Sequence, residues 1–495
     1  MVIRNIKNII AFAVMPIISI LIILFLDINP EHKEATYMLA VALLMASWWI
    51  LETVNLSVTA LLPVVLFPLL GIMDGEEVSS QYFNGIIFLF IGGFLIAIAM
   101  QKWNFHKRIA LTLLMLTGTS PARILLGFML TTYSISMWIS NTATTMMLLP
   151  IVLSVLSQLD ELYGKKNTYY FSIGVLLSIA YSSSIGGIAT LIGTPPNPIF
   201  LRIYQINFPQ GIEVNFANWF IYAFPLSLIL MIILYFLLYF LFIKNKCIEW
   251  ESKIKIDFHA DYKKLGNMSF EEKSVLVIFI MVAFLWLTRS PLEIGRVHIP
   301  GWSQLFSHPK YLNDGTVGIM MATILFLIPS KNKKGEFLMN WKDTIALPWG
   351  IIILFGGGFA LAEGFRTSGL SESIGEILHF FKGSSLFLLI FIVTSLMIFL
   401  TEITSNSSST VIILPILAAL AIATEINPLY LMIPATLGAS MAFMMPVATP
   451  PNAIVFSSQR IKISEMAKVG LILNIVVIFV ISLWTYFLTP IMFNF

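Results

Sequence analysis

Two short polar runs interrupt long apolar stretches of the chain, and each is followed by a second break that contains two adjacent prolines. The first pair of breaks is Ser140-Asn141-Thr142 and Thr194-Pro195-Pro196-Asn197, and the second pair is Ser405-Asn406-Ser407 and Thr449-Pro450-Pro451-Asn452. Hydroxyl, amide and backbone carbonyl oxygens are hard ligands, which suit alkali or alkaline-earth ions better than zinc or copper. Because none of the four runs contains a carboxylate, the donor set favours a monovalent cation.

The paired prolines free backbone carbonyl groups just before them, because proline cannot donate a helical hydrogen bond and its ring clashes with the preceding turn. Gly193 and Ala448 precede the two Thr-Pro-Pro-Asn runs and are small enough to let an ion approach those carbonyl groups. Asn141 and Asn406 can bind ions of either sign, since an amide offers its oxygen to a cation and its N–H groups to an anion.

The polar runs can also hold an anion, because the half-helix that begins after each of them points backbone N–H groups and its positive dipole end toward the centre. Each such dipole contact contributes only about 0.3–2 kcal/mol. Burying an unpaired anion costs far more, on the order of tens of kcal/mol in a simple Born treatment. An anion bound here would therefore need cations bound beside it.

The composition indicates that these breaks lie in a membrane. The chain has 495 residues, of which 58% are hydrophobic and 11% charged, whereas a typical soluble domain has about 25% charged residues. That excludes a soluble enzyme and a nucleic-acid-binding protein, and the one cysteine, Cys247, excludes an intrachain disulfide. We predict an all-α polytopic membrane protein with about eleven crossings of a bilayer core about 30 Å thick. The crossings are expected near residues 9–26, 37–54, 57–73, 84–101, 170–202, 216–243, 271–288, 314–330, 343–362, 428–456 and 464–491.

The two apolar stretches that contain the polar runs, about 122–155 and 384–425, are predicted to form re-entrant hairpins. A helix break exposed to lipid would leave backbone groups unpaired, so it is tolerated only inside protein or beside a wet cavity. With the N-terminus cytoplasmic and the C-terminus outside, this topology places most of the 29 Lys and Arg residues on the cytoplasmic side, as the positive-inside rule requires. Segments 102–117 and 365–383 are amphipathic and could lie along the interface as arms before each hairpin, although a charged amphipathic connector more often serves only as scaffolding.

The two halves of the chain repeat each other. Gly85–Phe94 aligns with Gly350–Phe359, and Leu149-Pro150-Ile151 aligns with Leu414-Pro415-Ile416, in the same order as the two pairs of breaks. The glycines inside the first two runs are predicted to permit close crossing of helices. An odd number of predicted crossings separates the hairpins, so the repeats are inverted, which is typical of secondary transporters with a site near the midplane. A duplication kept only for folding is the alternative, and the paired breaks favour transport.

These motifs resemble the divalent anion/sodium symporter family, whose members carry di- and tricarboxylates and, in some cases, sulfate. The resemblance covers nearly the whole chain, and the paired Ser-Asn-Thr signatures are specific to that family. It implies a homodimer whose subunits each have a scaffold and a transport domain that slides as an elevator. The implied parts are a first scaffold part with an interfacial arm (1–120), transport half 1 with the inward hairpin and a broken helix (121–245), a linker and second scaffold part (246–383), and transport half 2 with the outward hairpin and a broken helix (384–495).

In that family the two signatures lie at the hairpin tips and hold the substrate carboxylates. The resemblance assigns substrate binding to Ser140, Asn141, Thr142, Ser405, Asn406 and Ser407, with Thr194, Thr449 and Pro450 lining the same pocket. One sodium site would use Ser136, Ser140, Asn141 and Gly193, and the other would use Thr401, Thr404, Asn406 and Ala448. The second signature departs from the family pattern, because Ser407 keeps the hydroxyl group but lacks the methyl group of a threonine.

The predicted function is sodium-coupled import of C4-dicarboxylates such as succinate, malate or fumarate across the inner membrane. Sodium is the expected cofactor, with no organic cofactor, no enzymatic activity and no nucleic-acid partner. A sodium-independent dicarboxylate exchanger is the alternative, and citrate or sulfate are alternative substrates on the same fold. An anion channel would need a continuous pore, and a membrane enzyme would need a motif such as His-Glu-x-x-His, which the chain lacks. Glu402, next to Thr401, is expected to brace the second hairpin rather than bind an ion.

Overall fold

The computed structural model describes residues 6–30, 32–118, 120–244, 246, 258–294 and 297–493. Cys247, the one cysteine of the sequence, lies outside the described residues. Nearly all of the regular structure in these ranges is helical. A small antiparallel hairpin, β1 (Leu292–Ile294) and β2 (Val297–Ile299), departs from the all-α expectation. Strands of three residues are too short to show the alternating pattern by which strands are recognised, so the sequence did not reveal them.

The internal repeat appears as two series of helices that match element by element: a long helix, a short arm, two hairpin helices, a broken helix and a final long helix. The first series is α6 (Gly85–Lys102), α7 (Phe105–Thr117), α8 (Pro121–Ser136), α9 (Asn141–Tyr163), α10 (Lys165–Gly187), α11 (Pro196–Asn207) and α12 (Phe216–Leu238), which a π-helical turn extends over Tyr239–Ile243. The second series is α16 (Trp349–Thr367), α17 (Leu370–Leu378), α18 (Leu386–Thr401), α19 (Asn406–Thr424), α20 (Leu429–Ala439), α21 (Pro450–Phe456) and α22 (Ile463–Phe493), with a 3-10 turn at His379–Phe381 after α17.

The remaining helices precede each series. Before the first series come α1 (Ile6–Phe25), α2 (Lys33–Ile50), α3 (Leu56–Thr59), α4 (Leu62–Leu69) and α5 (Gly75–Ser80). Before the second come α13 (Phe258–Lys264), α14 (Phe270–Leu287) and α15 (Asp314–Leu327), with 3-10 turns at Trp302–Leu305, Pro309–Tyr311 and Trp341–Ala346. The span predicted to start near 343 begins later, at Trp349, because the 3-10 turn and Pro348 occupy the preceding residues.

Seven helices in the described part are long and apolar enough to cross a membrane, which agrees with a multi-pass membrane protein. They are Gly75–Lys102 (α5 and α6 taken together), Asn141–Tyr163, Lys165–Gly187, Phe216–Ile243 (α12 with its π-helical turn), Trp349–Thr367, Asn406–Thr424 and Ile463–Phe493. Five of the seven coincide with predicted crossings, whereas Asn141–Tyr163 and Asn406–Thr424 are the second helices of the predicted hairpins. Further predicted crossings fall on shorter apolar helices, at Phe12–Phe25, Leu56–Leu69, Asp314–Leu327 and Leu429–Ala439. The count of about eleven crossings and the re-entrance of the hairpins stay predictions.

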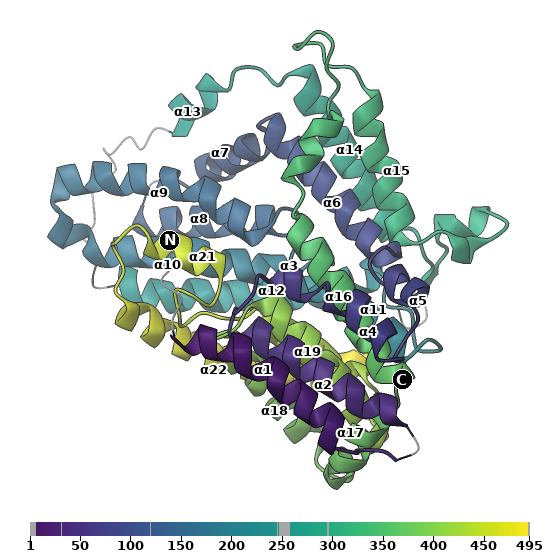
Figure 1. Ribbon diagram of the computed structural model, residues 1–495. Helices are drawn as coiled ribbons and strands as arrows, with labels where there is room; N and C mark the ends of the chain where they lie inside the picture. Colours follow the sequence, from purple (N-terminus) through teal and green to yellow (C-terminus); the bar gives the residue numbers. More distant parts are fainter. Residues whose placement is uncertain are drawn as a thin grey trace.

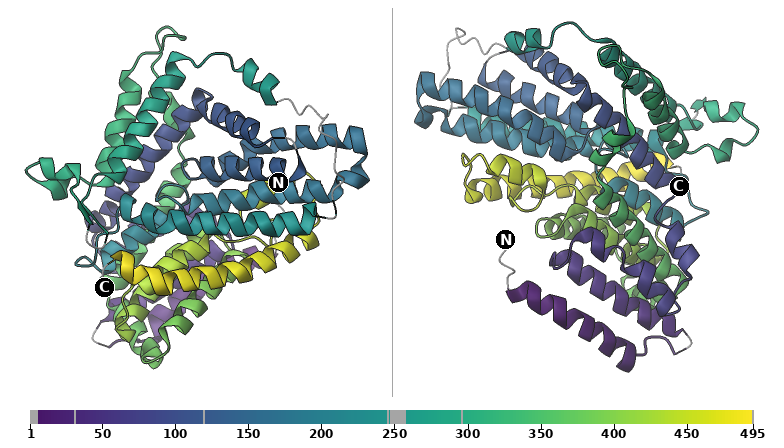
Figure 2. Two further views of the ribbon diagram at one scale, coloured as in Figure 1. Left: turned by 180° about the vertical axis from the view of Figure 1, so that it is seen from behind. Right: turned by 45° about the horizontal axis from the view of Figure 1, so that its top comes forward.

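Three groups of helices are easy to follow in the ribbon diagram. α6, α14 and α15 pack together at the upper right of Figure 1, and α8, α9 and α10 pack together at its left. α18, α20 and α22 form the third group, and α1 lies against α2 at the outer edge of the molecule (Figure 2). The repeats interlock between these groups, because α9 packs on α21 and α11 packs on α19. Each hairpin therefore contacts the broken helix of the other repeat.

Glycines in α6 and α16 allow the close helix contacts that the sequence predicted. A Cβ atom on Gly92 would lie 2.5 Å from the carbonyl carbon of Gly318 in α15, a distance that side chains do not adopt. A Cβ atom on Gly357 in α16 would likewise lie 2.3 Å from the backbone oxygen of Ala60. Only a residue without a side chain lets two helix backbones approach so closely, and the prediction is confirmed at both positions.

Charged residues gather at the two ends of α6. At its C-terminal end, Lys102 Nζ lies 2.8 Å from Asp343 Oδ2. At its N-terminal end, where Gly85 meets the start of α15, Arg289 is paired with Asp314 at 2.5 Å and with Glu213 at 2.8 Å. The topology predicted from the sequence puts Lys102 and Arg289 on opposite sides of the membrane, and in the structure they lie at opposite ends of α6. The sidedness itself stays a prediction.

Candidate functional site

Both predicted breaks lie where the hairpins turn. α8 ends at Ser136 and α9 begins at Asn141, and the Ser140 hydroxyl oxygen accepts the Ala143 N–H at 3.3 Å. In the second hairpin, Ser405 likewise caps α19, and its hydroxyl oxygen accepts the N–H of the third residue of that helix at 3.3 Å. Serine is common at the position before a helix because its side-chain oxygen accepts a hydrogen bond from a backbone N–H group that the helix leaves unpaired. Each signature thus forms the cap and first turn of the second hairpin helix.

An oxygen cluster lies at the base of each tip. Ser136 Oγ is 2.6 Å from Asn141 Oδ1 and 2.8 Å from the carbonyl oxygen of Ser183 in α10. In this arrangement three oxygens converge, and the Ser136 hydroxyl is the only group that can donate a proton among them. Such a cluster is rich in acceptors and poor in donors. Oxygens of this kind are the ligands that hard cations prefer.

The second repeat reproduces this cluster. Thr401 Oγ1 is 2.7 Å from Asn406 Oδ1 and 2.9 Å from the carbonyl oxygen of Ala439 at the end of α20. Thr401 is fully buried, as Ser136 is in the first cluster. The family resemblance implied that the side chains of both clusters are sodium ligands. It did not reveal the carbonyl groups of Ser183 and Ala439, because their positions depend on how the broken helices pack on the hairpins.

Gly193 lies against the first tip, as its predicted role requires. A Cβ atom at Gly193 would be 2.5 Å from Gly187 O and 2.9 Å from Met137 O. The Gly193 N–H donates to Thr190 Oγ1 at 3.1 Å, and that hydroxyl in turn donates to Met137 O at 2.5 Å. The unwound segment between α10 and α11 is thereby tied to hairpin 1, and glycine is needed because backbone surrounds it closely.

The second unwound segment, residues 440–449, is tied to its hairpin differently. The Glu402 carboxylate accepts the N–H groups of Phe443 at 2.7 Å, Met444 at 2.9 Å and Met445 at 3.0 Å. Asn474 in α22 donates to the same carboxylate at 2.7 Å. The prediction that Glu402 braces the second hairpin is confirmed.

The prolines begin the second halves of the broken helices, and the asparagine after them binds the unwound backbone. Pro196 is the first residue of α11 and Pro450 the first of α21, positions where the missing N–H group costs nothing. Asn197 Nδ2 donates to Thr190 O at 2.7 Å, and Asn452 Nδ2 donates to Met445 O at 3.0 Å. These asparagines were not among the predicted site residues, although the duplicated motif contained them.

The other predicted residues differ in how close they come to the clusters. Thr194 Oγ1 lies 3.2 Å from Ser440 Oγ, which links the two unwound segments. Thr449 Oγ1 is buried and has no hydrogen-bond partner within the described part of the chain. Thr404 does not join the Thr401 cluster through a hydrogen bond, because its hydroxyl donates to Leu400 O at 2.8 Å and also contacts the Ser409 hydroxyl.

The remaining predicted residues lie in the hairpin helices and in the second unwound segment. Ser407 is buried and Thr142 is half-buried, both in the first turn of their helices. The amide of Ala448 donates within its own segment, to Met445 O at 3.2 Å. Its connection to hairpin 2 therefore runs through the Glu402 contacts described above.

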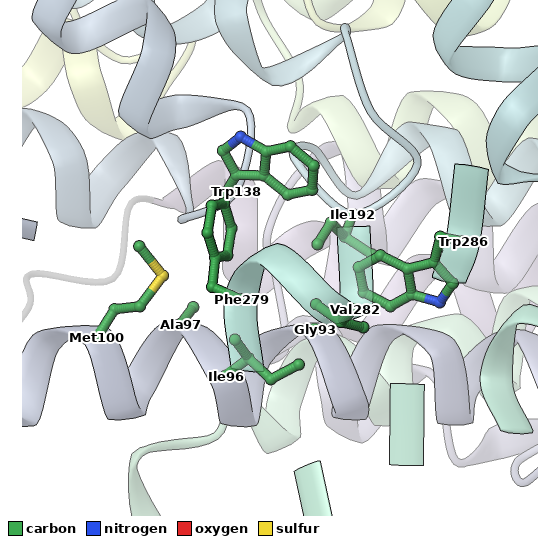
Figure 3. A pocket seen from close by; sticks show the side chains of 9 residues that line it. All are labelled: Gly93, Ile96, Ala97, Met100, Trp138, Ile192, Phe279, Val282 and Trp286. Carbon is green, nitrogen blue, oxygen red and sulfur yellow. The ribbon is translucent and has the colours of Figure 1, made fainter. Parts of the chain in front are cut away.

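An apolar cavity separates the first tip from α6 and α14, as Figure 3 shows. Trp138, just after Ser136, packs edge-on against Phe279 at 4.9 Å between ring centres, and Ile192 of the unwound segment faces Val282 and Gly93. Apolar and aromatic side chains make up this lining, so it holds no charged group that could pair with a carboxylate.

Comparison with known proteins identifies relatives along the whole chain. The family described as the sodium:sulfate symporter transmembrane region matches residues 7–493. The sodium-dependent dicarboxylate transporter SdcS of Staphylococcus saprophyticus is 40% identical over 491 residues, which is 98% of this chain and 92% of that protein. SdcS of Staphylococcus aureus strain bovine RF122 is 40% identical over 486 residues, which is 96% of this chain and 90% of that protein.

Two solved transporter structures share the fold at low sequence identity. The Neisseria gonorrhoeae MtrF efflux pump has a TM-score of 0.55 and 13% identity, and the match covers 83% of this chain and 84% of that one. The Alcanivorax borkumensis YdaH transporter has a TM-score of 0.55 and 12% identity, and the match covers 84% of this chain and 89% of that one. These likenesses support a helical transporter fold.

Proposed function

Because the chain belongs to the sodium:sulfate symporter family, we propose that it is a sodium-coupled symporter of C4-dicarboxylates such as succinate, malate and fumarate. The observation that carries the proposal is the pair of oxygen clusters around Ser136 and Thr401, each with three oxygens and one shared proton. Two sodium ions would complete these clusters. The 40% identity to sodium-dependent dicarboxylate transporters supports both the ion and the substrate class.

The substrate is proposed to bind between the two tips. The helices α9 and α19 begin there, so their free N–H groups and positive dipole ends would face the substrate carboxylates. Sodium bound beside them supplies the positive charge that these uncharged donors lack. The proposed substrate residues are Ser140, Asn141, Thr142, Thr194, Ser405, Asn406, Ser407, Thr449 and Pro450. The proposed sodium ligands are Ser136, Ser140, Asn141 and Gly193 in one site, and Thr401, Thr404, Asn406 and Ala448 in the other.

Transport is proposed to proceed by an elevator motion in a homodimer. Residues 121–245 and 384–495 would move as the transport domain, and residues 1–120 and 246–383 would form most of the scaffold. The close contacts of α6 with α15 and of α16 with the end of α3 favour a rigid scaffold, because two packed backbones cannot slide easily. The N-terminus is placed in the cytoplasm and the C-terminus outside.

Uptake into proteoliposomes tests the function directly. Purified protein is given radiolabelled succinate under an inward sodium gradient, and a potassium gradient of equal ionic strength serves as the control. We expect accumulation above the external concentration with sodium alone, and inhibition by unlabelled malate and fumarate. Equal accumulation in both gradients would contradict symport and favour the exchanger. Stronger inhibition by citrate or sulfate would reassign the substrate.

The ion site is tested by removing one hydroxyl group from α18. Thr401→Val keeps the shape of the side chain but removes the oxygen that joins Asn406 and the Ala439 carbonyl. We expect the half-saturating sodium concentration to rise about tenfold, as for loss of one interaction with an ion of about 1.5 kcal/mol. Thr394→Val is the matched control, because Thr394 is equally buried in α18 and donates to its own helix at Ile390 O. Unchanged sodium dependence in Thr401→Val would remove it from the site.

A further inference from the structure

One residue of the second unwound segment, Phe443, is hydrogen-bonded to side chains from both repeats. Glu402 of hairpin 2 accepts the Phe443 N–H at 2.7 Å, and the Tyr181 hydroxyl of α10 donates to Phe443 O at 2.7 Å. The same hydroxyl lies 3.4 Å from Met466 O at the start of α22. Tyr181 is fully buried, and its ring packs edge-on against that of Phe443 at 5.0 Å. The backbone of Phe443 is thus hydrogen-bonded to the first repeat through Tyr181 and to the second repeat through Glu402.

The residue that makes this contact also lies beside the first oxygen cluster. Tyr181 is two residues before Ser183, whose carbonyl oxygen accepts the hydroxyl proton of Ser136. One short stretch of α10 therefore touches the first cluster on one side and the second unwound segment on the other. A shift of this stretch would move the partner of the Phe443 carbonyl group.

A second bridge joins the two unwound segments directly. Thr194 Oγ1 and Ser440 Oγ are 3.2 Å apart, and both side chains are buried. Ser440 directly follows Ala439, whose carbonyl oxygen completes the second cluster. Tyr181 therefore joins the part of α10 beside the first cluster to the second unwound segment, and the Thr194–Ser440 pair joins the first unwound segment to the residue beside the second cluster.

We infer that Tyr181 and Ser440 are positioning residues that couple the two cation sites, so that an ion in the first site raises the affinity of the second. The inference rests on the proposed function, because it assumes that both clusters bind sodium. Coupling between sites is a free energy carried by contacts that differ between states, and packed hydrogen-bonded networks are one physical carrier of it. Residues 440–449, which leave the helical path between α20 and α21, are the element that would change.

The test is the sodium dependence of succinate uptake in proteoliposomes. Tyr181→Phe keeps the buried ring and its contact with Phe443 but removes the hydroxyl group. We expect a wild-type Hill coefficient for sodium near two, which falls toward one in Tyr181→Phe, and a rise of about fivefold or more in half-saturating sodium. A loss of folded protein alone would lower the maximal rate and leave the Hill coefficient unchanged.

Two further variants keep the test decisive. Tyr222→Phe is the matched control, because Tyr222 is equally buried and its hydroxyl bonds to Thr489 at 3.0 Å, away from both unwound segments. We expect its Hill coefficient to stay at the wild-type value. Ser440→Ala breaks the second bridge and is expected to lower the Hill coefficient as well, so it tests the inference even where Tyr181→Phe does not fold.

The outcomes separate this inference from the proposed function. Sodium-dependent uptake with a wild-type Hill coefficient of one, or with an unchanged coefficient in both Tyr181→Phe and Ser440→Ala, would overturn the coupling and leave symport intact. An equal fall in Tyr222→Phe would also overturn it, because the effect would then follow from any lost buried hydroxyl. Wild-type uptake without sodium dependence would instead overturn the proposed function.

Discussion

Replacing Glu402 with glutamine should loosen the second unwound segment while leaving its size and shape nearly unchanged. Oε1 accepts the N–H of Phe443 and the amide of Asn474, and Oε2 accepts the N–H of Met445 at 3.0 Å; Met444 N–H lies near both oxygens, at 2.9 and 3.1 Å. A glutamine has one oxygen, so its NH2 group must face at least one of these donors. Two donors then confront each other in a buried site.

The expected loss follows from these contacts. A buried donor left without an acceptor costs about 1–3 kcal/mol. The bonds that remain change from charge-assisted to neutral and keep roughly half of their strength, which removes about 1–2 kcal/mol more on the scale of 1.5–3 kcal/mol for a hydrogen bond to a charged group. Together these terms predict a destabilisation of about 2–5 kcal/mol of the native state around residues 440–449.

Thermal unfolding in detergent and sodium-driven uptake measure this effect. We expect Glu402→Gln to lower the apparent melting temperature by several degrees and to reduce the maximal uptake rate. Glu425→Gln is the matched control, because Glu425 is exposed and pairs with Lys382 on the surface; it should leave both readouts unchanged. A Glu402→Gln variant with wild-type melting and uptake would refute the idea that the carboxylate holds the unwound segment.

Two further predictions concern the packing of the helices and the charges at their ends. Gly92→Ala should destabilise the protein by about 1–3 kcal/mol, because the new Cβ atom would lie 2.5 Å from the backbone of α15, whereas Gly375→Ala, with no atom closer than 3.7 Å, should melt like the wild type. Burial raises the pKa of Asp343, but the hydrogen bonds from Lys102 and the Asn340 N–H, with the charges of Lys102 and Lys342, together outweigh it, so the pKa lies below its ordinary value. The stability from this pair is therefore present at neutral pH and lost as the pH falls through the lowered pKa, so the difference in melting temperature between wild type and Asp343→Asn should vanish in acid.

The sequence could predict the parts of the site that depend on local chemistry. A serine at the start of a helix and a proline at its first position act on their own backbone, so the breaks at Ser140 and Ser405 and the starts of α11 and α21 fall where the motifs put them. The glycine contacts of α6 were also predictable, because a repeated glycine pair in an apolar helix has few other uses.

The remaining contacts could not be read from the chain, because they join residues far apart in it. The carbonyl groups of Ser183 and Ala439 carry no side-chain signal, and any residue type supplies the same oxygen. The pairing of Tyr181 with Phe443 crosses the two repeats, and neither residue belongs to a duplicated motif. Such contacts are set by how α10 packs on α21, which only the three-dimensional structure specifies.

The two repeats show which features duplication preserved and which diverged. Met137 and Glu402 stand at the same position, four residues before the signature asparagine, and each ties a hairpin to its unwound segment. The backbone carbonyl of Met137 accepts a hydrogen bond from the Thr190 hydroxyl group. The side-chain carboxylate of Glu402 instead accepts hydrogen bonds from backbone N–H groups. The inner oxygens of the two clusters are the same in kind, but in the second hairpin the acidic Glu402 directly follows the cluster residue Thr401, whereas Met137 follows Ser136 in the first. Because an acidic group favours a nearby cation, we expect the two proposed sites to bind sodium unequally.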